Sequence, residues 1–198
     1  TLTYSGDDSR NKNLVVSSHV AFEGQTWDYQ LTITDADSEG NTDGGKALQL
    51  FWNNSTPVMG IAIIKPYNCD RKKNANSGDA LFRIDYSEAA VNGYDAQMEV
   101  RVAGLPLADP LTDPFSISTL HMYAARKGDV VDVFGNSNHP NATLFSTHTG
   151  FNWAFVASSN EKTNIAVAEV GLPPSTLSST DRTVLLKDYS IRNVMTEE

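Results

Sequence analysis

The stretch GFNWAFVASSNEKTNIAVAEVGLP, Gly150–Pro173, contains two apolar runs separated by a polar segment. The runs are Phe151–Ala157 and Ile165–Val170. Side chains alternate across a strand, so runs that are apolar on both faces predict strands that are covered on both sides. We therefore expect an antiparallel hairpin near the middle of a sheet. Glu169 is the residue that does not suit a core, and we expect its carboxylate to meet solvent.

Alternation of apolar and polar residues recurs along the chain. In Trp27–Asp35 it predicts a half-buried strand of an antiparallel sheet. Similar short runs, punctuated by Gly, Asn, Asp and Ser, give about ten or eleven strands with few helical stretches. This pattern predicts an all-β fold, a two-sheet antiparallel β-sandwich of jelly-roll-like form. A β-barrel and two small β domains are the alternatives.

Two of these strands, Ala80–Tyr86 and Ala96–Val102, flank an Asn-Gly pair that favours a two-residue hairpin turn. Closing the hairpin there would place apolar residues opposite charged ones, although directly opposed residues share a face. A shift of one residue would pair Ile84 with Val102 and the acidic Asp85 with the basic Arg101. We therefore predict a bulge, a short helical turn or a loop longer than two residues between the strands.

The length of 198 residues suits one domain that spans residues 1–198. At 40% hydrophobic residues, the chain has ample material for a core. The segment Leu105–Pro114 holds three of the eight prolines. Because proline cannot donate to a strand ladder, we expect this segment to be irregular. It is the candidate for a crossover between sheets or a subdomain boundary.

The net charge of −9 argues against a nucleic-acid partner, because such partners bind largely through neutralised phosphates. No apolar run approaches the ~20 residues of a transmembrane helix, and Val58–Ile64 is the longest candidate. The chain begins at Thr1 rather than at Met and shows no signal peptide, so we expect a processed or trimmed chain. We expect an extracellular, periplasmic or surface-anchored location, with a cytoplasmic one as the alternative.

An acidic loop places carboxylates at alternate positions before a glycine, as calcium-binding loops do. Its candidate ligands are Asp35, Asp37, Glu39 and Asp43. The match to the helix–loop–helix calcium motif is incomplete, because the twelfth position is Lys46 and both flanks are predicted strands. We therefore expect a solvated loop, in which Asp and Gly serve turn geometry, and no cofactor. Calcium is the alternative.

Other candidate ligand-binding residues lie beside polar loops. Trp52 and Asn54 adjoin the loop that follows a predicted strand, and Trp52 is the tryptophan expected to be exposed. His139 and His148 lie in or beside loops around Ala142–Phe145. An exposed tryptophan ring can stack on a sugar ring, and the polar side chains lie in or beside loops. These four residues form our predicted ligand-binding set.

The sequence contains no nucleophile elbow, P-loop, dinucleotide fingerprint or cysteine pair for zinc. Our leading interpretation is a secreted or cell-surface β-sandwich that binds carbohydrate, or a surface protein, through loops at a sheet edge. We lean toward a protein that is not an enzyme. One alternative is a glycoside hydrolase or lyase that uses a carboxylate pair. Another is a structural or adhesive domain. The candidate carboxylates for a catalytic pair are Asp85, Glu88, Glu99 and Glu169.

The closing segment Lys187–Val194 resembles the last strand of jelly-roll carbohydrate-binding modules. The resemblance implies a closing strand, which we place within Val184–Met195.

Overall fold

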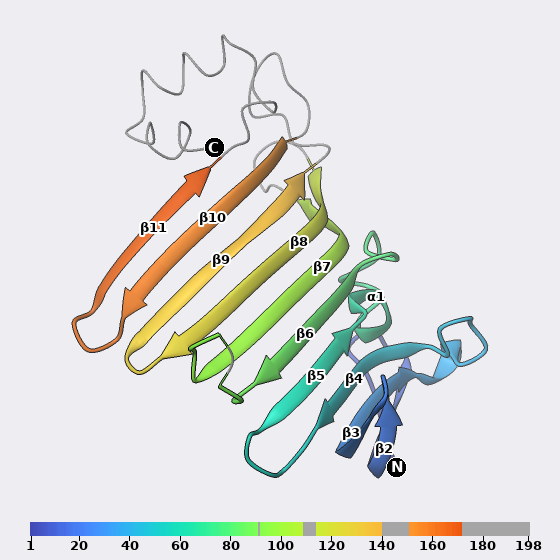
Figure 1. The fold of residues 1–198 in the computed structure, drawn as a ribbon. Helices are drawn as coiled ribbons and strands as arrows, with labels where there is room; N and C mark the ends of the chain where they lie inside the picture. Colours follow the sequence, from blue (N-terminus) through green and yellow to red (C-terminus); the bar gives the residue numbers. More distant parts are fainter. Residues whose placement is uncertain (91, 109–113, 140–150, 172–198) are drawn as a thin grey trace.

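The structure is a computed structural model that describes residues 1–90, 92–108, 114–139 and 151–171. These residues form an all-β fold of eleven antiparallel strands in one open sheet (Figure 1). The strands follow one another across the sheet in the order of the sequence. Their bounds are β1 (Leu2–Ser5), β2 (Asn11–Phe22), β3 (Gln25–Asp35), β4 (Lys46–Trp52), β5 (Met59–Ile64), β6 (Leu81–Ser87), β7 (Ala96–Ala108), β8 (Pro114–Lys127), β9 (Val130–His139), β10 (Phe151–Asn160) and β11 (Ile165–Gly171).

The described helices are short: the 3₁₀ turn η1 (Ala36–Ser38) and the one-turn α1 (Pro66–Cys69). None of the helices in the described part of the chain is long and apolar enough to cross a membrane. Every described strand belongs to the one sheet, so the expected two-sheet sandwich is not confirmed. Alternation along a strand indicates which residues share a face, but it does not indicate how many sheets the strands form. The predicted closing strand, Val184–Met195, lies outside the described residues.

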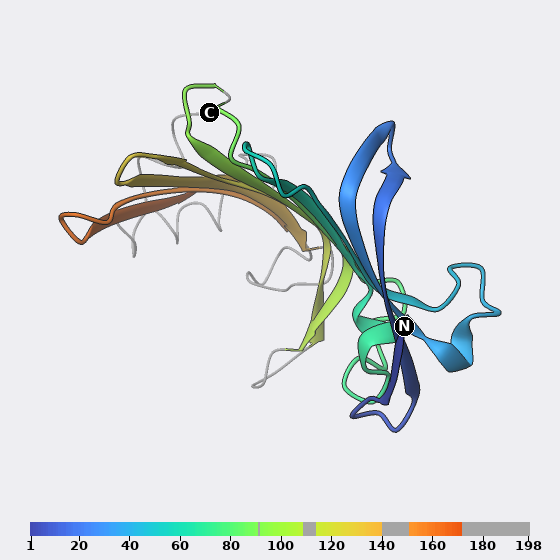
Figure 2. The same ribbon diagram turned by 90° about the horizontal axis from the view of Figure 1, so that it is seen from below.

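The core lies where the end of the β2–β3 hairpin meets the next two strands. Figure 2 shows that the sheet is curved and that β2 and β3 turn out of the plane of the later strands. Trp27, Phe51 and Ile61 form the buried cluster. The ring of Phe22 stacks on that of Phe51, with 4.1 Å between the ring centroids. The bend of the hairpin therefore gives one end of an open sheet a packed interior.

The predicted hairpin at Gly150–Pro173 is confirmed: β10 and β11 pair antiparallel, with Asn160 opposite Ile165. Its predicted place near the middle of the sheet is wrong, because β11 is the last strand in the described order. Ile165 and Val167 are each 63% exposed, so the apolar runs are not covered on both sides. Glu169 is exposed, as expected.

The connection between β6 and β7 runs from Ser87 to Ala96, which confirms a loop longer than two residues. The expected pairing is wrong, because Ile84 lies opposite Val100 and not opposite Val102. Both registers place apolar residues on the same face, so alternation alone cannot distinguish them.

The expectation of irregular structure throughout Leu105–Pro114 is wrong for residues 105–108, which continue β7. There Pro106 lies opposite Ser116 of β8. The pairing of β7 with β6 reaches only as far as Ala103, so this end of β7 has a neighbour on one side alone among the described strands. Proline is tolerated in such edge segments because its missing N–H breaks no second ladder.

Candidate functional site

The registers of β6 to β10 sort their side chains onto two faces. Directly opposed residues share a face, so the row through Ile84, Val100 and Met122 makes one face apolar. The residues between them project from the opposite side and are mostly polar. We call that side the polar face, and its central rows contain Arg83, Asp85, Glu99, Arg101, His121 and Tyr123.

A pocket of about 330 Å³ opens on the polar face, between the strands β5 to β8 and the β2–β3 turn. We call it the carboxylate pocket, because Glu23, Asp85 and Glu99 all line it. Phe22 and Trp27 contribute aromatic walls. The pocket therefore combines acidic groups with apolar ring surfaces, within the size range of ligand-binding clefts.

Like charges face each other across β6 and β7 beside this pocket. Asp85 lies opposite Glu99, and Arg83 lies opposite Arg101. Such pairs repel, but each arginine turns to a carboxylate two residues away on its own strand. Arg83 contacts Asp85 at 2.8 Å and Arg101 contacts Glu99 at 2.5 Å. The charges of the four side chains are therefore balanced along the strands and not across them.

Arg83 also donates two hydrogen bonds of 2.7 Å to the carboxylate of Glu23. These bonds lower the pKa of Glu23 below its usual range. The bonds from Arg83 to Asp85 and to Glu23 raise the pKa of the guanidinium in turn. Arg83 thus fixes two carboxylates that come from distant parts of the chain.

Glu99 is the most contacted carboxylate of the pocket. Its Oε1 lies 2.5 Å from Nε2 of His121. Burial alone would raise the pKa of Glu99, but hydrogen bonds with His121, Tyr123 and Arg101 outweigh burial and lower it. The carboxylate therefore stays ionised at neutral pH and acts as a hydrogen-bond acceptor. The bond to Glu99 raises the pKa of the Tyr123 hydroxyl, so the phenol stays protonated.

An aromatic row leads from the pocket across β8 and β9. The ring centroids of His121 and Tyr123 are 4.8 Å apart, and those of Tyr123 and Phe134 are 5.2 Å apart. The rings of Tyr123 and Phe134 are nearly parallel, with an interplanar angle of 21°. Phe134 is 41% exposed, which is unusual for a phenylalanine. The rings of Tyr123 and Phe134 therefore offer a flat apolar surface beside the ionised Glu99.

Of the predicted ligand-binding residues that the structure describes, Trp52 and Asn54 lie apart from His139. Trp52 ends β4 and stacks on Tyr29 at 5.4 Å, and Asn54 follows in the exposed loop. His139 ends β9, five strands further along the sheet, which corresponds to roughly 24 Å at the usual strand spacing. The described structure includes the backbone of His139, and His148 lies outside the described residues.

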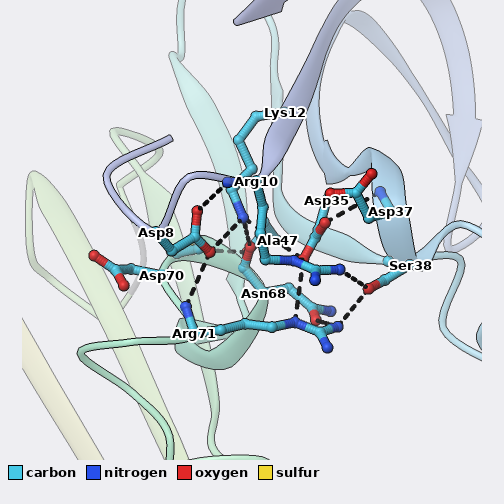
Figure 3. Close-up of polar contacts among 12 residues, drawn as sticks. Asp8, Arg10, Lys12, Asp35, Asp37, Ser38, Ala47, Asn68, Asp70 and Arg71 are labelled. Carbon is cyan, nitrogen blue, oxygen red and sulfur yellow. Dashed lines mark hydrogen bonds and ion pairs between the residues drawn. The ribbon is translucent and has the colours of Figure 1, made fainter. Parts of the chain in front are cut away.

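Three of the four predicted calcium ligands, Asp35, Glu39 and Asp43, have carboxylates that contact other side chains. Figure 3 shows Asp35 and Asp37. Asp35 is fully buried, and its Oδ2 lies 2.7 Å from Nε of Arg10. Asp37 donates its backbone N–H to Asp35, and Glu39 accepts a hydrogen bond from Asn13. Among the described residues, no group of three or more His, Cys, Asp or Glu side chains is placed to hold a metal ion. Asp43 is 2.9 Å from the side chains of both Lys65 and Asn68.

Asp35 instead belongs to a buried ion network. Besides Arg10, the cations around its carboxylate are Arg71, at 3.1 Å, and Lys12, at 3.6 Å. Lys12 is itself buried and lies 3.1 Å from Asp8. The network joins β2, the end of β3 and the segment after α1, so it connects parts of the chain that are far apart in sequence (Figure 3).

We expect this network to make stability fall in acid. Burial would raise the pKa of Asp8, but hydrogen bonds from Arg71 and Lys12 outweigh it and lower the pKa to about 2. Contacts with the surrounding cations also lower the pKa of Asp35 against the effect of burial. Carboxylates with a lowered folded-state pKa stabilise the fold above the unfolded pKa of about 4. That contribution disappears as the pH falls from about 4 to about 2.

Urea unfolding at a series of pH values measures this effect. The free energy of unfolding should decline steeply between about pH 4 and pH 2, and the decline should be shallower in Asp8→Asn. A free energy of unfolding that does not change over this interval would contradict the stabilising role of the network.

Sequence reasoning named Asp85 and Glu99 as candidate carboxylates, and the structure places them opposite each other. It did not identify the contribution of His121 and Tyr123. The signal was available, because residues 119, 121 and 123 alternate onto one face of a predicted strand. What was missing was the register that sets this strand against Glu99.

Together these features define an all-β protein with a carboxylate-lined and aromatic pocket on one face of an open sheet. A scan of family models and searches of the curated proteins and of the solved structures gave no match to this chain.

Proposed function

We propose that this protein binds carbohydrate on the polar face of its sheet. The observation that carries the proposal is the ionised Glu99 beside the stacked rings of Tyr123 and Phe134. Sugars present hydroxyl groups at their edges and apolar C–H surfaces on their faces. A carboxylate accepts hydrogen bonds from the hydroxyls, and an aromatic ring packs against the C–H surface.

The ion pairs around the pocket favour a neutral ligand. Arg83 is held by Glu23 and Asp85, and Arg101 is held by Glu99. An anionic ligand would have to compete with these carboxylates for the guanidinium groups, and a cationic one would have to displace the arginines. Hydroxyl groups can join the network without breaking an ion pair, because carboxylate oxygens accept more than one hydrogen bond.

Hydrolysis by a carboxylate pair is the second candidate. Directly opposed Asp85 and Glu99 have Cβ atoms about 4.5–5.5 Å apart, and retaining glycosidases place two carboxyl groups about 5–5.5 Å apart. A general acid needs a raised pKa, however, and the pKa of Glu99 is lowered. The geometry therefore supports binding better than turnover. We also propose that the protein acts outside the cytoplasm, where it would meet a polysaccharide ligand.

A glycan screen tests the proposal. Purified protein is applied to a glycan array and run through native gels that contain soluble polysaccharides. We expect retention by at least one neutral polysaccharide, and no release of reducing sugar from it on prolonged incubation. Absence of binding in both assays would overturn the proposal, and steady release of reducing sugar would favour the hydrolase.

A further inference from the structure

The carboxylate pocket is one of three hollows that lie in a row on the polar face. A central hollow of about 350 Å³ shares Arg83 with the carboxylate pocket. A third hollow of about 460 Å³, which we call the amide pocket, shares Thr119 with the central one. Each hollow shares a lining residue with the next, so the three are neighbours, and we call this row of hollows the groove.

The amide pocket differs from the carboxylate pocket in its chemistry. Asn136, Asn138 and Asn152 line it together with Thr119, and none of these four side chains carries a charge. Asn138 donates a hydrogen bond to Asn152 across β9 and β10. Amide groups both donate and accept hydrogen bonds, as sugar hydroxyls do. Asn136 and Asn152 are exposed, so their amides are accessible to a ligand.

The central hollow is bordered by apolar side chains. Leu81 and Ala103 lie opposite each other on the polar face, and Leu81 is 37% exposed. Arg101 and His121 border the same hollow. A ligand that passes from the carboxylate pocket to the amide pocket therefore meets an apolar surface between two hydrogen-bonding regions.

The groove runs obliquely across the strands, because Thr119 of the amide pocket lies four residues along β8 from Tyr123 of the carboxylate pocket. From Arg83 on β6 to Asn152 on β10 it crosses four strand spacings, or roughly 19 Å. This length exceeds that of a single sugar ring.

We propose that the ligand is a linear, neutral, β-1,4-linked hexose chain that lies across β6 to β10. This inference rests on the proposed function and adds the class and the length of the ligand. The carboxylate pocket binds one end of the bound segment, and the amide pocket binds the other end. Between them, the apolar faces of the sugar rings pack over the central hollow. A β-1,4-linked chain is extended and ribbon-like, so it can follow a groove on an open sheet without coiling away from it.

Calorimetric titration with two oligosaccharide ladders tests the inference. The probes are cellobiose to cellohexaose and mannobiose to mannohexaose. In at least one ladder, affinity should rise by about tenfold or more from the disaccharide to the hexasaccharide, as hydrogen bonds in the amide pocket are added. The double variant Asn136→Ala/Asn152→Ala should lose this gain, so that its affinity for the hexasaccharide falls at least tenfold below that of wild type.

Asn54→Ala is the matched control, since it removes an exposed amide that does not line any of the three hollows. Thermal melts confirm that each variant is folded. The inference is overturned if affinity does not depend on length, if the double variant behaves as wild type, or if neither ladder binds. Failure of both ladders alongside a positive glycan screen would leave carbohydrate binding in place and reject only this ligand class.

Discussion

Replacing Asp35 by alanine should lower the free energy of unfolding by about 3–5 kcal/mol at neutral pH. The Asp35 carboxylate is fully buried, and Arg10, Lys12 and Arg71 all lie within 3.6 Å of it. Its removal leaves the buried ammonium group of Lys12 with a single carboxylate partner, Asp8, among the ion pairs of the described residues. Leaving a buried charge without its partner costs far more than breaking a solvated pair.

Asp7→Ala provides the control, because it makes the same chemical change at a surface ion pair. Asp7 is 84% exposed and lies 3.3 Å from Lys73. Exposed pairs contribute little, so this variant should stay within about 0.5 kcal/mol of wild type. Urea unfolding followed by circular dichroism measures both variants. Equal losses in the two would show that the Asp35 network does not stabilise the fold, whereas failure of Asp35→Ala alone to fold would agree with it.

Replacing Tyr123 by alanine should weaken binding to the retained polysaccharide by about 2 kcal/mol, which is roughly 30-fold in Kd. Tyr123 lies between His121 and Phe134 in the aromatic row and also bonds Glu99. Its loss removes the central ring of the aromatic row and one hydrogen-bond partner of the Glu99 carboxylate. Tyr123→Phe keeps the ring, so it should retain most of the affinity.

Tyr94→Ala is the matched control for this variant. Tyr94 is half-buried in the loop before β7, where its hydroxyl donates to Asp132 at 3.1 Å. It should change mobility in the polysaccharide gel little. If Tyr94→Ala and Tyr123→Ala weaken binding equally, or if Tyr123→Ala binds as wild type, the aromatic row is not the binding surface.

The sequence predicted the strands well, because alternation is a local property of the chain. Trp27–Asp35 corresponds closely to β3, and Trp27 is buried as its apolar row indicates. The register between β6 and β7 could not be predicted in the same way. The expected match of Ile84 with Val102 looked favourable because it also set opposite charges against each other. In the structure the charges pair within each strand, so they do not determine which residues of β6 and β7 lie opposite each other.

The candidate site was predictable in its parts and not in its assembly. Asp85 and Glu99 were recognisable as candidate acids on strands, and alternation along a strand places His121 and Tyr123 on one face. Their meeting depends on pairings between strands, which the pattern within a strand does not contain. Burial of Lys12 was not predictable either, because its partners Asp8 and Asp35 become neighbours only when β2 and β3 come together.

The consecutive order of the strands has a consequence for the way the chain folds. Each described strand pairs with the strand that precedes or follows it in the sequence, so each new pairing closes only a short loop. Folds with such local pairing have low contact order and form faster than those that join distant strands. During synthesis, the N-terminal strands and their core around Phe51 can assemble before β11 has left the ribosome, and each later strand then finds its template already in place.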